Sequence, residues 1–575
     1  MRIKFLSKIL YVCLASAVLA MFTATLLAQS DNGSISGFVH DPSGATIPNA
    51  NVTVQNQANG NERKSTTNGS GYYTVTSLPP GLYKVSADAP GFKRYETSNN
   101  KLDSNSSLSV DASLTVGNAT ETVEVTSTAP ALQSESAAVQ KLVTREQIDA
   151  LELNGRNPIL MAQLVPGTRG GTLAGLNFNF SQGPSQINGA RTPESLITYD
   201  GAPAVRTRSN GTSLGAADVD STQEIQVMTA NYGAEYGRSS GGQIRIVTKA
   251  GGTDFHGAGY EYLRNNNLNA NTWGRNANPA TGFVGPMHYN QYGYNVGGPF
   301  YIPGKFNKDK SRFFWYWGQE WVKYHYTETN ASSGNNGNLL VPSLKMRTGD
   351  FSELLGPNFF YNTPRVIIDP RTGTPFQGNI IPTNRLSPNG IGLLNAYPVP
   401  NVTTPIGGGN WVTSALHTVD QRKDQLNADM NLTDNQRLTF RRSSFHYLEY
   451  QPLDGGSDRT PKFFDRPNQT NSLGYIWTIS PTVVNEALAT VSLDNVYIPV
   501  DLANFYNRAN AGINYPYIFP GGKTVPTRIP TINLAGFSTL NGGPYPSHSS
   551  GPIYTVSDTL TWIKGNHTLD RKSVV

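Results

Sequence analysis

The second half of the chain alternates apolar and polar residues over long segments. In one of the clearest, every second residue is large and apolar: Leu473, Tyr475, Trp477 and Ile479. Side chains alternate faces along a β-strand, so each segment has one apolar and one polar face. The pattern predicts eight strands and the start of a ninth, at 254–264, 288–299, 311–325, 418–431, 436–449, 469–480, 484–495, 553–564 and 566 onward.

The connections between these segments alternate between long and short. The long ones are 265–287, 326–417, 450–468 and 496–552, and the short ones lie around Pro303, Thr433, Pro481 and Lys564. A transmembrane β-barrel has this asymmetry, with short periplasmic turns and long external loops. Five aromatic residues are candidates for the membrane interface: Trp315, Trp317, Trp321, Tyr324 and Tyr326. The alternative, two soluble sandwich domains, does not explain why all long loops fall at one end.

Residues 29–118 show a different pattern of short alternating runs. The runs are Ser34–His40, Ala50–Gln55, Tyr72–Ser77, Tyr83–Ala87 and Leu108–Val116, separated by turns rich in Gly, Pro and Asn. Regular spacing of short strands and turns predicts a small β-sandwich.

Residues 130–252 mix short helices and strands. Thr144 and Gln147 form a capping box that predicts a helix, and Asn157-Pro158 predicts a second one. In the stretch 217–252, we interpret Asp218 and Asp220 as a helix cap and first-turn acid rather than calcium ligands. Strands at 224–228 and 242–248 follow, and Gly251-Gly252 ends the stretch.

The N-terminus and the composition restrict the class of protein. A basic head with Arg2, Lys4 and Lys8 precedes an apolar run to Leu27, which predicts a secretory signal cleaved after Ala28. An uncleaved anchor helix is the alternative. The single cysteine, Cys13, lies within this run. Three of the five net positive charges lie in the same segment, which argues against a nucleic-acid-binding face.

Two short patterns suggest chemistry, and the local structure argues against both. Gly211–Gly215 matches the G-x-S-x-G nucleophile motif but lies in a polar loop without a following helix. His446 and Glu449 have the spacing of zinc ligands, but positions three apart on a strand face opposite ways. We therefore expect no enzyme activity, no catalytic residues, no metal site and no cofactor.

Residues 119–129 separate the first two regions and contain the alternating segment ETVEVT, residues Glu121, Thr122, Val123, Glu124, Val125 and Thr126. The alternation favours an extended strand. It is either the last strand of the sandwich, a linker, or a strand offered to the sheet edge of a partner.

Several longer motifs carry a family resemblance. The string GSISGFVHDPSGATIPNANVTVQN and its continuation to Lys93 resemble a carboxypeptidase-regulatory-like domain, an accessory module without a peptidase site. They are followed by LNGRN (Leu153–Asn157), INGAR (Ile187–Arg191), YDGAP (Tyr199–Pro203) and NYGAEY (Asn231–Tyr236). In this order the motifs resemble an outer-membrane TonB-dependent receptor of the Oar-like kind.

The resemblance implies a plug domain inside the barrel, and that ETVEVT is similar to a TonB box, which passes a strand to the periplasmic energy-transducing protein TonB. The plug motif residues it implies are Asn154, Gly155, Arg156, Asn157, Asn188, Gly189, Arg191, Asp200, Gly201, Tyr232, Glu235 and Tyr236. The chain departs from the family in its strand number, since a plugged barrel has roughly 22 strands. We interpret it as C-terminally truncated.

The expected protein is mainly β: a signal peptide (1–28), a transthyretin-like sandwich (29–118), a TonB-box-like linker (119–129), an α/β plug (130–252) and a partial barrel (253–575). The expected function is TonB-dependent, plug-gated uptake across the outer membrane of a Gram-negative cell. The expected partners are TonB, outer-membrane lipid and an extracellular carbohydrate, peptide or chelate, with no nucleic acid. The alternative is a surface adhesin or carbohydrate-binding sandwich protein without transport.

Overall fold

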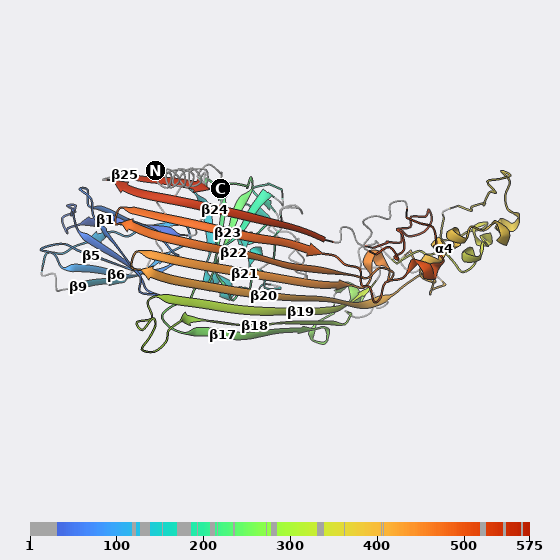
Figure 1. Ribbon diagram of the computed structural model, residues 1–575, viewed down its shortest axis with the longest axis horizontal. Coiled ribbons are helices and arrows are strands. Elements are labelled where there is room, and N and C mark those ends of the chain that lie inside the picture. The colour runs from blue at the N-terminus through green and yellow to red at the C-terminus, as the bar shows by residue number, and fades with distance from the viewer. Residues whose placement is uncertain are drawn as a thin grey trace, which may run out of the picture.

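The computed structural model describes residues 32–574 apart from internal gaps. The gaps are 118–121, 127–137, 152, 154, 170–185, 192–193, 207–212, 216, 234–235, 272, 278–284, 330–337, 362, 404, 406–407, 518–524, 544–547 and 565–566. The predicted signal peptide therefore lies outside the described residues. In Figure 1 the sandwich lies at one end, a sheet of long strands covers the plug in the middle, and the long loops extend at the other end.

The N-terminal sandwich has two sheets around one hydrophobic core. One sheet contains β4 (Tyr72–Leu78), β1 (Gly33–His40), β7 (Ser107–Ser109) and β8 (Ala112–Ser113). The other has the order β3 (Glu62–Thr66), β2 (Asn51–Asn56), β5 (Gly81–Asp88), β6 (Arg94–Leu102) and β9 (Thr122–Thr126). Apolar side chains from both sheets, among them Ile35, Val54, Tyr73 and Val85, are buried between them. The predicted sandwich is present, with two strands, β3 and β6, that the sequence pattern did not indicate.

The plug is a mixed five-stranded sheet with short helices. The strand order is β10 (Val139–Val143), β15 (Thr222–Ala230), β16 (Gly242–Thr248), β13 (Ser195–Tyr199) and β14 (Ala202–Pro203), and β11 (Thr168–Arg169) pairs with β12 (Gln186–Ile187). The expected capping box is present at Thr144, where α2 (Arg145–Ala150) begins. The second expected helix is the 3-10 helix η1 (Pro158–Leu164), capped by Asn157. Buried apolar side chains of these elements form the core of the plug.

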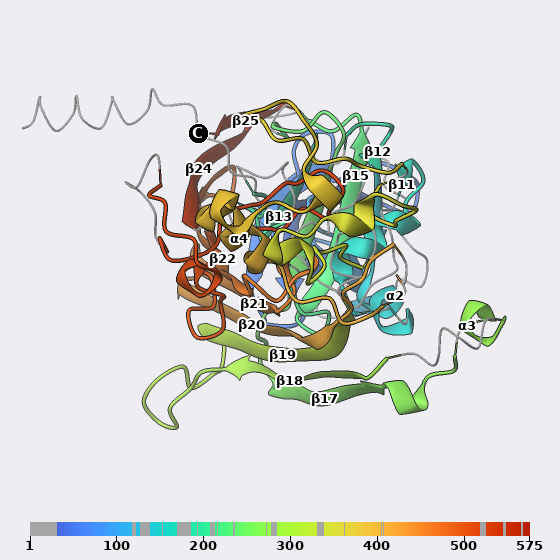
Figure 2. The ribbon, with the colours of Figure 1, turned by 90° about the vertical axis from the view of Figure 1, so that its right-hand side faces the viewer.

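The strands of the second half form one antiparallel nine-stranded sheet in chain order. Its strands are β17 (His256–Asn265), β18 (Met287–Pro299), β19 (Phe313–Thr329), β20 (Ser414–Thr433), β21 (Gln436–Gln451), β22 (Lys462–Ser480), β23 (Val483–Tyr497), β24 (His548–Lys564) and β25 (His567–Val574). All nine predicted segments are strands. Among the described strands, β17 and β25 have one sheet neighbour each, so the sheet is an open curved wall. Figure 2 shows this wall bending around one side of the plug.

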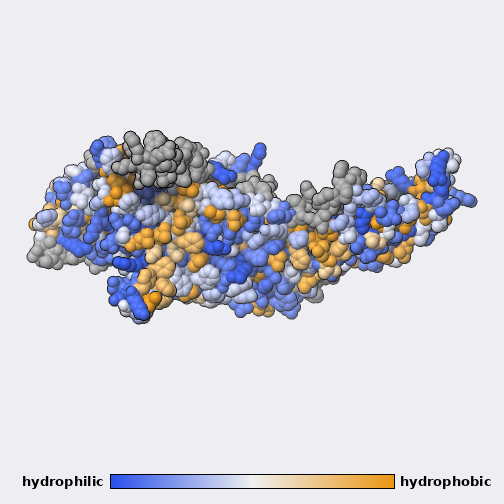
Figure 3. Space-filling model, in the orientation of Figure 1, coloured by the Kyte–Doolittle hydropathy of each residue, from blue (hydrophilic) through white to orange (hydrophobic). Residues whose placement is uncertain are grey.

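The two faces of the wall differ as expected for a barrel. On β22, Ser472 and Gly474 face inward, whereas Leu473, Trp477 and Ile479 face outward and are exposed. Hydrophobic side chains gather on the half of the wall nearer the sandwich (Figure 3). The outward face farther along carries charged residues such as Arg422, which pairs with Asp424. A 20-residue strand is about twice the length that a bilayer needs, so the wall continues beyond the membrane on the loop side. No helix among the described residues is long and apolar enough to span a bilayer.

Two long loops pack together into an extracellular lobe. It contains α4 (Pro388–Ala396) and the 3-10 helices η5 (Met346–Thr348), η6 (Ser352–Leu354), η7 (Gln377–Asn379), η8 (Thr383–Arg385) and η10 (Arg508–Ala511). Leu339, Tyr397 and Trp411 of one loop share a hydrophobic core with Ile532 and Leu540 of the other. Elsewhere, η3 (Asn266–Leu268) and α3 (Trp273–Ala277) follow β17, and η9 (Asp454–Gly456) follows β21.

Two local expectations are wrong. Asp218 and Asp220 do not begin a helix: Asp218 accepts hydrogen bonds from the Asp220 N–H and the Ser221 hydroxyl, both at 2.9 Å, and closes a turn before β15. Tyr324 and Tyr326 do not belong to the outer aromatic belt. They share the inward-facing register of Tyr316. The Tyr326 ring stacks on the ring of buried His417, with 4.6 Å between the ring centres. Trp315, Trp317 and Trp321 have the opposite, outward register.

Candidate functional site

The plug motifs form tight turns that place their side chains against the plug sheet. Asn188-Gly189 and Asp200-Gly201 both have positive φ at both residues, which Asn, Asp and Gly tolerate best. Asp200 accepts hydrogen bonds from the N–H and hydroxyl of Thr248 at 2.9 and 2.7 Å. Asn188 donates to the carbonyl of Thr229 at 2.8 Å. The motifs therefore fix the ends of the plug strands.

Arg156 of the LNGRN motif connects the plug to the wall. Its backbone, like that of Gly155, has positive φ. The guanidinium pairs with Asp220 and lies over the ring of Tyr262 in β17, 4.1 Å from its centre. Asn157 caps the following helix by accepting from the Ile159 N–H at 3.0 Å. Asn154 lies outside the described residues.

The remaining predicted plug residues stay within the plug. Tyr236 accepts a hydrogen bond at 3.0 Å from buried Arg245, and the Tyr232 ring meets the Tyr236 ring edge-on. Arg191 is exposed, and its backbone N–H donates to Glu194. Glu235 lies outside the described residues. Tyr232 and Tyr236 thus support the loop between β15 and β16, and among the described residues neither contacts Arg156.

Hydrogen bonds, a buried ion pair and apolar packing join the plug to the wall, where Phe445 of β21 lies in the hydrophobic core of the plug. Asn427 of β20 donates to the Thr248 hydroxyl at 2.7 Å and to the Lys249 carbonyl. Tyr316 of β19 donates to the Ser221 hydroxyl at 3.0 Å. A buried ion pair joins Arg206 to Asp494 of β23 at 3.3 Å. The sequence did not mark these wall residues, because their alternation with apolar neighbours shows only that they face inward.

The connection between β16 of the plug and β17 of the wall, which contains Gly251 and Gly252, also contacts the sandwich. A Cβ on Gly251 would lie 2.3 Å from the Trp315 carbonyl oxygen, so a side chain does not fit there. The next non-glycine residue, Thr253, donates its N–H to the carbonyl of Ala58 in the sandwich at 3.0 Å. The glycine pair thus lets the chain approach the wall closely while it contacts the sandwich.

The sandwich is attached to the plug through the loop after β6. The Ser104 N–H donates to the Glu224 carboxylate at 2.8 Å, and the Gln226 side-chain amide donates to the Ser104 carbonyl at 2.9 Å. The pKa of Glu224 is raised to about 7, mainly by burial; the hydrogen bond from Ser104 acts against this increase, and the neighbouring Asp103 contributes to it. Sequence reasoning missed both plug residues, since polar residues on an alternating strand are usually solvent-facing.

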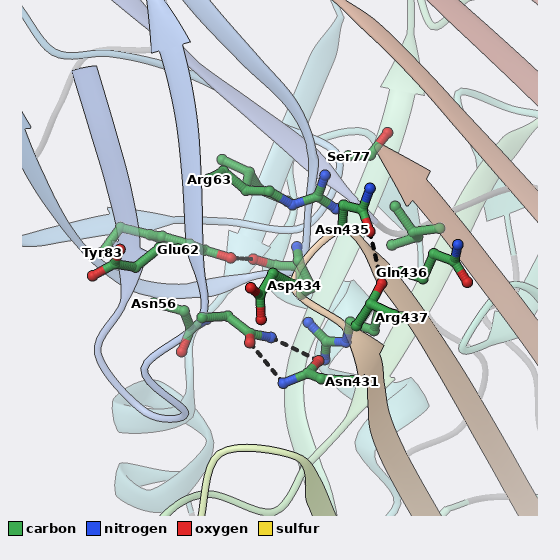
Figure 4. Close-up of a pocket in the computed structure, with 15 residues that line it drawn as sticks. Asn56, Glu62, Arg63, Ser77, Tyr83, Asn431, Asp434, Asn435, Gln436 and Arg437 are labelled. Atoms are coloured by element: carbon green, nitrogen blue, oxygen red, sulfur yellow. Dashed lines mark hydrogen bonds between the residues drawn. The ribbon is translucent and has the colours of Figure 1, made fainter. Parts of the chain in front are cut away.

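The sandwich also touches the wall at its turn end. The side-chain amides of Asn61 and Asn431 exchange hydrogen bonds, and Asn32 donates to Glu486 at 2.6 Å. Figure 4 shows this junction, where Glu62 and Arg63 of β3 face Asp434 and Asn435 of the wall. Burial and the nearby Arg437 lower the pKa of the Arg63 guanidinium to about 10.

A cavity of about 570 Å³ lies where sandwich, plug and wall meet. Lys101 of the sandwich, Glu224 of the plug, and Arg441 and Glu486 of the wall line it. The lining carries both positive and negative side chains, so its charge does not indicate one class of ligand.

The TonB-box-like segment is a strand of the sandwich. β9 pairs in parallel with β6, with Arg94 opposite Thr122 and Ser98 opposite Thr126. Glu121 lies outside the described residues. Of the three alternatives for this segment, the position of β9 is that of the last strand of the sandwich. Its predicted role as a partner-binding strand stays a prediction.

The strand orientation explains one candidate feature of the sequence, the pair with zinc-ligand spacing. His446 points outward to Asp465 at 2.8 Å, whereas Glu449 points inward to His417 at 2.9 Å, so the pair with zinc-ligand spacing is divided between the two faces of the wall.

Comparison with protein families agrees with the order of these parts. The model of the carboxypeptidase regulatory-like domain matches residues 34–115, that of the TonB-dependent receptor plug domain matches 131–243, and that of the outer membrane beta barrel domain matches 247–570. The fold and these matches define an outer-membrane β-barrel protein with a plug and an N-terminal sandwich. The chain belongs to the outer membrane beta barrel domain family, whose model covers more than half of it.

Individual relatives are more distant. The chain is 26% identical over 279 residues to the TonB-dependent transporter Oar of Myxococcus xanthus, covering 47% of this chain and 25% of the relative. Similar solved structures include the outer membrane transporter YddB from Escherichia coli, with 11% identity, TM-score 0.44 and coverage of 75% of this chain and 47% of that one. Another is the siderophore receptor PirA from Acinetobacter baumannii, with 12% identity, TM-score 0.35 and coverage of 75% and 46%. The chain thus matches less than half the length of each.

Proposed function

We propose that this chain is part of a plug-gated outer-membrane receptor that takes up its ligand with energy supplied by a periplasmic TonB-type protein. The observation that carries the proposal is a plug held against the concave face of the wall by hydrogen bonds and ion pairs, such as those of Asn427 and Arg206. Polar contacts of this kind exchange with water at a small net cost each, so a plug can shift without unfolding.

The proposed site of energy input is the segment 121–126. Its alternation of Val with Thr and Glu suits a strand that a partner's sheet edge accepts. The ligand is an extracellular carbohydrate, peptide or chelate that meets the lobe formed by the two long loops. The proposal includes no catalytic step, no cofactor and no nucleic acid.

The test is a proline at the centre of the segment. Val123→Pro removes one backbone N–H and restricts φ, so it should abolish binding of the full chain to the purified C-terminal domain of the host's TonB-type protein. Val123→Thr is the matched control, because it keeps the N–H and the β-branch and should bind as the parent does. Undiminished binding of the proline variant, or recovery of the protein in the soluble periplasm instead of the outer-membrane fraction, would contradict the proposal.

A further inference from the structure

The five-stranded sheet of the sandwich has two edges with opposite surroundings. At the edge formed by β3, Glu62 and Arg63 lie beside the turn Asp434-Asn435 of the wall (Figure 4). β9 forms the other edge, four strand spacings away, or about 19 Å at about 4.8 Å each. Figure 1 places β9 at the end of the molecule remote from the extracellular lobe. One edge therefore faces the wall, and the other points away from it.

The β9 edge has the features of a binding edge. Within the described part of the chain, β9 pairs with β6 alone, so the backbone groups on its other side have no strand neighbour there. The β3 strand carries Arg63 and Lys64, the kind of residue that discourages edge pairing, whereas β9 has the sequence TVEVT without Lys, Arg or Pro. An open, extended edge of this composition is suited to accept a strand.

We propose that the sandwich is a docking platform that holds β9 in strand conformation, so that the energy-transducing partner adds its own strand to the open edge of β9 while β9 remains paired with β6. This inference rests on the proposed function. The partner it fits is a periplasmic domain with an unpaired strand edge. Because β9 is already ordered, binding avoids much of the entropy cost of fixing a flexible peptide.

The same arrangement connects the platform to the plug. β6 ends at Leu102, and two residues later Ser104 is hydrogen-bonded to Glu224 and Gln226 of β15. β10, the first plug strand after β9 in the chain, pairs with β15 as well. A load applied to β9 therefore reaches β15 by two routes, one through β6 and one along the chain.

A disulfide lock tests whether β9 stays in place. Ser98→Cys with Thr126→Cys joins opposed positions of β6 and β9, and opposed residues of paired strands lie within the distance that a disulfide spans. The natural sequence has no cysteine after Cys13, so the introduced pair forms without competition. Binding of the full-length variant to the purified C-terminal domain of the host's TonB-type protein is measured oxidised and reduced. We expect equal or tighter binding in the oxidised form.

Loss of binding on oxidation that is reversed by reduction would overturn the proposal, because β9 would then have to leave β6. Arg94→Cys with Thr122→Cys is a second lock at the other end of the pair and decides the matter if the first pair perturbs the sheet in both redox states. Asn51→Cys with Asp88→Cys, between β2 and β5, is the matched control for a disulfide that does not involve β9. A failure of the proposed function itself gives a different result, because Val123→Pro would then bind the TonB-type domain as the parent does.

Discussion

The side-chain amides of Asn61 and Asn431, 370 positions apart in the chain, donate hydrogen bonds to each other at 3.0 and 2.6 Å. Asn61 ends the loop between β2 and β3, and Asn431 precedes the turn between β20 and β21. A reciprocal amide pair satisfies a donor and an acceptor on each side and fixes the relative orientation of the two groups. The pair therefore helps to fix the orientation of the sandwich relative to the turn end of the wall.

Asn61→Ala should loosen this junction without unfolding the sandwich. The substitution leaves the partner amide with fewer hydrogen bonds, at a cost of about 1–2 kcal/mol. Amide hydrogen exchange in residues 57–61 and in the turn 433–436 should rise roughly 5- to 30-fold if opening of the junction controls it. Asn51→Ala, at an exposed position of β2 in the same domain, should leave exchange at the junction unchanged. Equal exchange in both variants would show that the pair does not hold the junction.

The stability of the contact between sandwich and plug should depend on pH through Glu224. The folded-state pKa of this carboxyl is raised to about 7 from an ordinary value of 4.5, mainly by burial. A raised carboxyl pKa means that the folded state binds the proton more tightly than the unfolded state. Its stabilising effect is therefore fully present below about pH 4.5, is lost as the pH rises towards 7, and amounts to about 3 kcal/mol at most.

Glu224→Gln isolates this effect, because the amide does not titrate and its oxygen still accepts from the Ser104 N–H. The variant should match the parent near pH 4.5 and exceed it in stability at pH 8, as measured by thermal unfolding across this range. Lys101 and Asp103 also face this site, and burial raises the pKa of Asp103, so the difference between parent and variant is the informative quantity. A difference that does not change with pH would refute the assignment.

The wall and the motif turns could be predicted because local rules dominate in them. Alternation places Leu473 and Trp477 on one face whatever the neighbouring strands are, and all nine predicted segments are strands of one sheet. Likewise, Asn188-Gly189 and Asp200-Gly201 favour tight turns through their own backbone preferences. These features depend on residues close in sequence, so the sequence shows them directly.

The missed features depend on distant partners. β3 (ERKST) and β6 (RYETSNNKL) carry many charged and amide side chains, and they are strands because β2 and β5 pair with them. Glu224 and Gln226 contact Ser104, about 120 residues earlier. Asp218 looked like a helix cap because its side chain satisfies nearby donors equally well in a turn. Tertiary contacts therefore decided the strands and the buried plug residues, whereas a local turn decided the role of Asp218.

Tyr397→Phe should weaken the extracellular lobe. The Tyr397 hydroxyl lies between the carbonyl oxygens of Ile532 and Ser538, at 3.3 and 3.0 Å, and so joins the two long loops. Removing it leaves one buried and one partly buried acceptor with fewer donors, at a cost of about 1–2 kcal/mol. Limited proteolysis should cut residues 498–547 faster, with the wall unaffected. Tyr301→Phe, at a half-exposed turn on the opposite end, is the control, and equal cleavage of both variants would contradict the prediction.

Arg156→Ala should loosen the plug from the wall at β17. Its guanidinium pairs with Asp220 and stacks on Tyr262, and both charged side chains are about one-fifth exposed. Removing the cation leaves a carboxylate that is only about one-fifth exposed with less compensation, which for a partly solvated pair costs about 1–3 kcal/mol.

The charge and the stacking of Arg156 can be separated. Arg156→Lys should recover only part of the loss, because an ammonium lacks the planar group that stacks on the ring. The measurement is amide exchange in β15 and η1 of the full chain in detergent, which should rise in the order parent, lysine variant, alanine variant. Arg191→Ala, which removes an exposed arginine from the neighbouring plug motif, should behave as the parent. If the Arg191 and Arg156 variants exchange alike, Arg156 contributes only general charge, and the contact with Tyr262 does not hold the plug.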